Sequence, residues 1–267
     1  MLRCLKDLEG YTVSATDGDM GTVVNFLLDD ERWVVRYLVV ETGVFLNGQR
    51  VLISPISFGS VEWQTQRFHV DLTMDRVQHS PPVDLADSLS RPAELEYLSY
   101  YGYSPYWKDS NRYSLGPRPR PPAARQTVLQ RLDSSASSSR VRSAAEVRGY
   151  HIQGEDEPIG HVSDFIVDDA TWEIRYLVID TRNWWFGQKV LVAPHWASVI
   201  SRKEKKVFVA MSRQAIKSSP RWNATATINR EYEGRLYEYY GRQVYWDNPE
   251  PSEGTATSKP SRDSVGY

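Results

Sequence analysis

The chain has 267 residues and a formal net charge of −2, with 32 Lys and Arg against 34 Asp and Glu, a length that accommodates about two domains. Its single cysteine, Cys4, excludes an intrachain disulfide and a cysteine-based metal cluster. The start MLRCLKDLEG lacks the apolar core of a signal peptide, and no run approaches the roughly 18 apolar residues of a membrane-spanning helix, so we expect a cytoplasmic protein.

One stretch of the sequence occurs twice. Residues 21–42, GTVVNFLLDDERWVVRYLVVET, return as residues 160–181, GHVSDFIVDDATWEIRYLVIDT, at an offset of 139, and 11 of the 22 positions are identical. Self-similarity over this length predicts a duplicated structural unit. We expect the shared core of the two copies to consist of Gly21, Trp33, Tyr37, Leu38, Gly160, Trp172, Tyr176 and Leu177.

In chain order, residues 5–13 open the first copy, with a short apolar strand expected after Gly10, and a β-hairpin follows. Apolar residues alternate with polar ones from Gly21 to Leu28, Asp29 and Asp30 favour a turn, and an apolar pattern resumes at Trp33. One face of the second strand carries Trp33, Val35, Tyr37 and Val39, and the other begins polar at Arg36 and becomes apolar at Leu38 and Val40. Apolar residues on both faces predict a closed barrel with something packed outside it.

Shorter elements complete each copy. Strands are expected at residues 51–53 and 190–192, before Pro55 and Pro194, and a strand pair around each of the polar turns 64–66 and 203–205. Thr73 and Ser212 can cap a short helix, and Ser90 and Asn229 can cap a second helix that stops at Gly102 or Gly241. Each copy then ends in Tyr-Trp, at residues 106–107 and 245–246.

Composition divides the rest of the chain. We predict a first barrel repeat with a helical arm over 1–107, a flexible basic linker over 108–142, a second repeat with its arm over 143–246, and a disordered tail over 247–267. The linker carries eight basic and two acidic side chains, which gives it a charge of +6 and leaves −8 for the remainder.

This pattern resembles the PRC-barrel family: a Gly-Tyr strand, a DGxxG-like turn, an acidic hairpin and an RYLVV(D/E)T strand, over roughly 70 to 80 residues of each half. The second copy departs from it at EDEPIG, where the family has Asp-Gly. The resemblance implies a mainly β chain with two small Sm-like barrels in tandem. It also implies a bacterial docking module similar to the cytoplasmic domain of the photosynthetic reaction centre H subunit and to the C-terminal domain of ribosome maturation factors.

The charged residues have structural interpretations. Asp29, Asp30, Asp168 and Asp169 could bind a cation as paired carboxylates, but hairpin turns explain them better, and Arg36 and Arg175 suit ion pairs with neighbouring carboxylates. The five histidines do not recur between the copies, and no catalytic triad or phosphate-binding loop is evident. We therefore predict no catalytic residue, no metal site and no cofactor.

One loop is a candidate for partner binding. Phe45 and Leu46 align with Trp184 and Trp185, and Phe186 extends the second set. Apolar loop tips are covered either by the protein itself or by a partner.

The sequence predicts a non-enzymatic binding or scaffolding protein that docks onto a protein complex, with peripheral membrane contact at photosynthetic or respiratory complexes left open. An RNA- or ribosome-associated factor is the alternative, which the acidic folded parts disfavour. An intramolecular pseudo-dimer or a homodimer also remains open.

Overall fold

The structure is a computed structural model of the chain. It describes residues 1–43, 48–82, 89–107, 141–181, 188–223 and 227–247. The chain divides into two compact units, Met1–Ala226 and Thr227–Tyr267. Below, the first half means residues 1–107 and the second half means residues 141–223, and both belong to the first unit.

The first half is built on one sheet. Its strands pair in the order β5-β4-β3-β2-β7-β6. β3 and β4 form the predicted hairpin, in antiparallel register from Gly21 opposite Thr42 to Asp29 opposite Val34, whereas β2 and β7 are parallel. The strands are β2 (Thr12–Ala15), β3 (Gly18–Asp29), β4 (Val34–Thr42), β5 (Arg50–Ile53), β6 (Phe58–Glu62) and β7 (Arg67–Val70).

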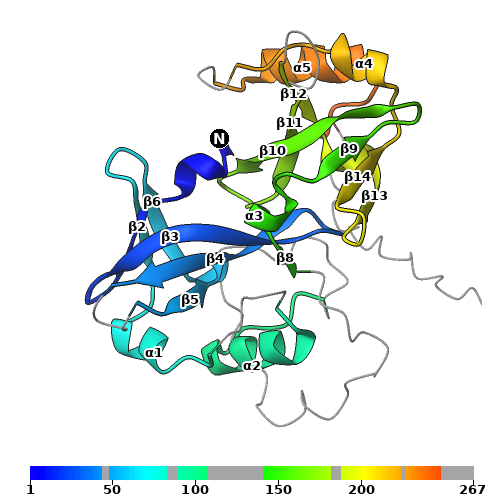
Figure 1. The fold of residues 1–267 in the computed structure, drawn as a ribbon. Coiled ribbons are helices and arrows are strands. Elements are labelled where there is room, and N and C mark those ends of the chain that lie inside the picture. Colours follow the sequence, from blue (N-terminus) through cyan, green and yellow to red (C-terminus); the bar gives the residue numbers. More distant parts are fainter. Residues whose placement is uncertain (44–47, 83–88, 108–140, 182–187, 224–226, 248–267) are drawn as a thin grey trace, which may run out of the picture. The chain divides into compact units, whose positions relative to one another are not determined.

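The second half repeats this order. Its strands pair as β12-β11-β10-β9-β14-β13, so every pairing of the first sheet recurs. The strands are β9 (His151–Gln153), β10 (Pro158–Asp168), β11 (Ile174–Asp180), β12 (Lys189–Val192), β13 (Ala197–Ser201) and β14 (Lys206–Val209). The two sheets are shown in blue to cyan and in green to yellow in Figure 1.

The predicted helix caps are confirmed. Thr73 and Ser212 accept backbone N–H bonds at the starts of α1 (Met74–Gln78) and α4 (Arg213–Lys217). Ser90 and Asn229 do the same for α2 (Arg91–Tyr101) and α5 (Arg230–Tyr239). Gly102 ends α2 in the left-handed conformation, with φ 75°. The remaining short elements are η1 (Lys6–Leu8), η3 (Pro55–Ser57), η4 (Pro194–Trp196) and α3 (Ala144–Val147).

Two strands that the sequence did not predict join the halves. β1 (Leu2–Cys4) pairs with β10 of the second half, and β8 (Val141–Ser143) pairs with β3 of the first half; Figure 1 shows β8 alongside β3. The predicted linker therefore extends two residues too far, because Val141 and Arg142 belong to β8. Residues 108–140 of that linker lie outside the described residues.

The core of each half is the long hairpin. β4 is buried from Val34 to Val40, which includes Arg36 with 5% of its surface exposed. The ion pair predicted for Arg36 is confirmed. Its guanidinium is kept inside because Nη2 donates to Asp29 Oδ2 at 3.1 Å and the cation stacks on the Tyr106 ring.

Candidate protein-docking site

A half-open pocket of about 310 Å³ lies where the two halves meet. The first half contributes η3, β6 and the following residue, and the second half contributes the turn between β10 and β11. The lining residues are Pro55, Ile56, Phe58, Gly59, Ser60, Val61, Trp63, Asp169, Ala170 and Trp172. Most of this lining is apolar or aromatic, which is typical of sites that bind a side chain or a small ligand.

The wall from the second half is fixed by its turn. Asp168 Oδ1 accepts the Ala170 N–H at 3.0 Å, and the Trp172 N–H donates to the Asp168 carbonyl at 2.7 Å. These bonds hold Trp172 at φ 59°, an uncommon conformation for a bulky residue. Its buried indole then packs edge-on against Phe58, with ring centroids 5.0 Å apart. The pocket wall is therefore rigid and depends on both halves.

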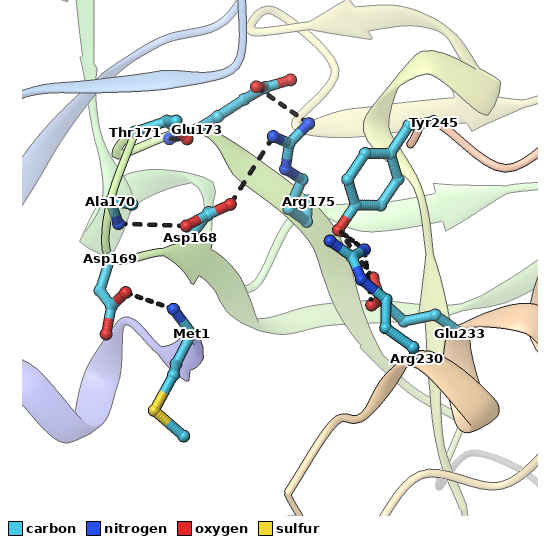
Figure 2. A network of polar contacts seen from close by, with 10 residues as sticks. All are labelled: Met1, Asp168, Asp169, Ala170, Thr171, Glu173, Arg175, Arg230, Glu233 and Tyr245. Atoms are coloured by element: carbon cyan, nitrogen blue, oxygen red, sulfur yellow. Dashed lines mark hydrogen bonds and ion pairs between the residues drawn. The ribbon is translucent and has the colours of Figure 1, made fainter. Parts of the chain in front are cut away.

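The charges at the rim are paired with each other. Asp169 Oδ2 accepts the Arg3 Nε–H at 2.8 Å. The other oxygen of Asp169 contacts the amino group of Met1, a contact that Figure 2 shows. The Arg3 guanidinium also lies 3.4 Å from the centroid of the Trp63 ring. These contacts pair the Asp169 carboxylate at the rim of the pocket.

The repeat defines an equivalent position in which the roles of the two halves are exchanged, and the residues at that position differ from those of the pocket. At the offset of 139, Phe58 corresponds to Ala197 and Trp63 to Arg202, so two of the three aromatic walls are missing there. Arg202 instead approaches Glu146, with 3.4 Å between nitrogen and oxygen. The two copies have therefore diverged at this pocket, although the hairpins beside it kept their sequence.

A buried polar cluster fixes α2 in the first half. Glu94 is fully buried and accepts hydrogen bonds from the Tyr37 and Tyr106 hydroxyls at 2.9 Å each and from Arg91 at 3.1 Å. Burial raises the pKa of Glu94, against the opposing effect of the two tyrosine hydrogen bonds. The carboxylate is saturated with donors from one helix, one strand and one loop, so its role is to anchor the helical arm.

The second unit contains the equivalents of three members of this cluster, Arg91, Glu94 and Tyr106. Arg230 Nη1 donates to Glu233 Oε2 at 3.1 Å, and the Tyr245 hydroxyl donates to Glu233 Oε1 at 3.0 Å (Figure 2). The Arg230 guanidinium also faces the Trp246 ring at 4.3 Å. The final Tyr-Trp of each repeat therefore closes onto the first turn of its own helix.

The structure locates the other residues that the sequence singled out. Tyr37, Leu38, Tyr176 and Leu177 are at most 1% exposed, and Trp33 is half-buried in the turn before β4. Gly21 and Gly160 lie where neighbouring backbone leaves no room for a side chain. The loop residues Phe45, Leu46, Trp184, Trp185 and Phe186 lie outside the described residues.

The acidic pairs form turns and ion pairs. Asp29 Oδ1 accepts the N–H groups of Glu31 and Arg32 at 3.1 and 3.0 Å. Arg175 lies between Asp168 and Glu173, at 3.7 and 2.9 Å, as Figure 2 shows. Within the described ranges, no group of three His, Cys, Asp or Glu residues could hold a metal ion, and no described helix is long and apolar enough to cross a bilayer.

Sequence reasoning missed Arg3, Phe58 and Trp63. A signal existed for Arg3, because it matches Arg142 at the repeat offset. Phe58 and Trp63 carried no such signal, since their equivalents are Ala197 and Arg202. Comparing the two copies identifies only residues that they share, whereas the pocket is lined by Phe58 and Trp63, which the second copy lacks.

The comparison with known families gives one result for the second half. Comparison with curated proteins finds no match for this chain. The family model described as the PRC-barrel domain matches residues 140–214. The match runs from β8 to the start of α4 and so includes the strand that pairs with the first half. Residues 140–214 of this mainly β chain are thus similar to the PRC-barrel domain.

Proposed function

We propose that this chain is a non-catalytic docking protein made of two PRC-barrel repeats, each a small barrel left open between its end strands. The support for a first repeat in residues 1–107 is internal. Its strand order and helix caps recur in the second half at the offset of 139, and half of the hairpin positions are identical. A duplicated module without an evident catalytic constellation suits binding rather than chemistry.

The observation that carries this proposal is the pocket between the halves. Its aromatic wall comes from both halves, and its counterpart position has lost two of the three aromatic residues. Phe58 packs against Trp172 and Trp63 lies under the Arg3 guanidinium, whereas the counterpart position has Ala197 and Arg202 although equivalent strands surround it. Retaining Phe58 and Trp63 on one side therefore fits recognition of a partner at that side.

The occupant we propose is an apolar or aromatic side chain from an extended segment of a partner protein. The pocket is small for a cofactor but adequate for one large side chain. β6 stands at the end of the sheet order, paired with β7 along one edge, and Gly59 and Ser60 on it are exposed. An extended peptide could add to such an edge and place one residue in the pocket.

A peptide-display selection tests this function. Random peptides selected on the full chain should bind through an aromatic or large aliphatic residue, and Trp63→Ala should weaken binding at least tenfold, the loss expected when an aromatic contact in a docking pocket is removed. The matched control is Arg202→Ala, the equivalent position in the second half, which should leave affinity unchanged. Selected peptides that bind both variants equally would show that the pocket is not the docking site.

A further inference from the structure

The halves are joined by reciprocal contacts that follow the repeat offset. Leu2, Arg3 and Cys4 lie opposite Asp168, Val167 and Ile166, and the equivalent residues of β8 lie opposite the equivalent residues of β3. Arg3 binds Asp169 at 2.8 Å, and Arg142 binds Asp30 in the same way. Each half therefore donates its first strand to the other and receives one in return.

The hairpin turns add a second set of equivalent bonds. The Val35 N–H donates to the Trp172 carbonyl at 2.9 Å, and the Ile174 N–H donates to the Trp33 carbonyl at 2.7 Å. Both tryptophans have positive φ, at 55° and 59°, which is strained for such residues. The carbonyl of each of these tryptophans accepts the hydrogen bond from the other half, so the uncommon turn conformation contributes to the contact between the halves.

One contact joins two residues that are each other's equivalents. Glu9 corresponds to Arg148 at the offset of 139, and the two side chains form an ion pair in which both are largely shielded from solvent, with 25% and 15% exposed. Because these two equivalent residues contact each other, they lie where the repeat relation between the two halves has its centre. If two first halves paired in this way, Glu9 would face Glu9, and in two second halves Arg148 would face Arg148.

We propose that the strand exchange is a self-sufficient interface for a second copy of the repeat, and that the Glu9–Arg148 pair selects an unlike copy. Opposite charges favour pairing of the first half with the second, whereas like charges at the same place disfavour either half pairing with itself. The intervening residues 108–140 then raise the effective concentration of the halves but do not hold them together.

Cutting the full chain within residues 108–140 tests the interface. A protease site is inserted there, the purified protein is cleaved, and native mass spectrometry with size-exclusion chromatography follows the fragments. We expect one complex of one first and one second fragment, at the mass of the intact chain, that persists on the order of 1 µM. Separate fragments at tenfold higher concentration, or homodimers of either fragment, would overturn the proposal.

Charge exchange tests the selecting pair in the same cleaved protein. Arg148→Glu should raise the dissociation constant of the fragments at least tenfold, and Glu9→Arg combined with Arg148→Glu should restore it. Arg50→Asp is the control, because it breaks the exposed ion pair between Arg50 on β5 and Glu41 on β4, away from the exchange. A double variant as weak as the single one would show that Arg148 acts through packing and would refute charge selection.

Discussion

Asn25 and Asp164 occupy equivalent positions beside the exchanged strands, but they differ in charge. Asn25 Oδ1 accepts the Ala145 N–H at 3.1 Å, and Asp164 Oδ1 accepts the Lys6 N–H at 3.2 Å. Burial raises the pKa of Asp164 from 3.8 to about 6, although backbone hydrogen bonds and Arg148 lower it. The equivalent backbone N–H is therefore accepted by a neutral amide in the first half and by a carboxyl group with a raised pKa in the second half.

This difference predicts a dependence of stability on pH. The folded state binds the Asp164 proton more tightly than the unfolded state, so the stabilisation is complete below pH 3.8 and is lost as the pH rises through about 6. The difference between the pKa of Asp164 in the unfolded and in the folded state corresponds to a contribution of about 3 kcal/mol to the free energy of unfolding. Asp164→Asn should therefore raise the free energy of unfolding at pH 7 and flatten its dependence between pH 4 and 7, as measured by urea denaturation.

The matched variant is Asn25→Asp. It places a carboxylate at the equivalent position, so it should lower stability at pH 7 by a similar amount and steepen the pH dependence. Equal pH profiles for the wild type and Asp164→Asn would show that the Asp164 carboxyl titrates as it does in the unfolded chain.

The helix α2 depends on one buried residue more than on its own propensity. It has 11 residues, a length at which an isolated helix is marginal in water. Glu94 provides its anchor by accepting from Tyr37 on β4 and Tyr106 after the helix. Removing that acceptor would leave two hydroxyls without their partner in a buried place, which is more damaging than the loss of one hydrogen bond.

We therefore expect Glu94→Ala to open α2 before the sheet unfolds. Hydrogen exchange of the amides of Arg91–Tyr101 should accelerate by at least tenfold, while the amides of β3 and β4 change less, since the cost of two unpaired buried hydroxyls is about 2 to 4 kcal/mol. Glu96→Ala, at an exposed position of the same helix, is the control. Uniform acceleration over helix and sheet would instead make Glu94 part of the global core.

The sequence allowed the elements within each half to be predicted because their signals are local. Thr73, Ser90, Ser212 and Asn229 cap helices, and the Asp-Asp pairs start turns, through contacts only a few residues away. β1 and β8 have three residues each and pair across more than 100 positions, so no periodicity marks them. The pocket escaped prediction for the same reason, because Trp63 and Trp172 come from different halves and line one pocket only where the halves meet.

The exchange makes the two sheets of the first unit depend on each other. A Cβ at Gly160 would lie 2.1 Å from the backbone oxygen of Asp180, so β10 and β11 would have to separate. β10 also holds β1, the strand from the first half. Damage to one sheet should therefore reach the other through the donated strands.

We expect Gly160→Ala to destabilise both halves together. Overpacking of this kind typically costs about 1 to 3 kcal/mol, which corresponds to a fall in Tm of about 5 °C. Amides of β3 and β4 should lose protection together with those of β10. Gly43→Ala is the control, because nothing lies within 4 Å of its Cβ. Loss confined to the second half would show that the halves unfold independently.

The only thiol of the chain sits on a donated strand. Cys4 is half-buried opposite Ile166, and burial raises its pKa to about 12, so very little reactive thiolate forms at neutral pH. Once β1 leaves β10, the sulfur regains an ordinary acidity and becomes accessible. The rate at which a maleimide labels the wild-type protein therefore measures how often the exchanged strands come apart, without any engineered probe.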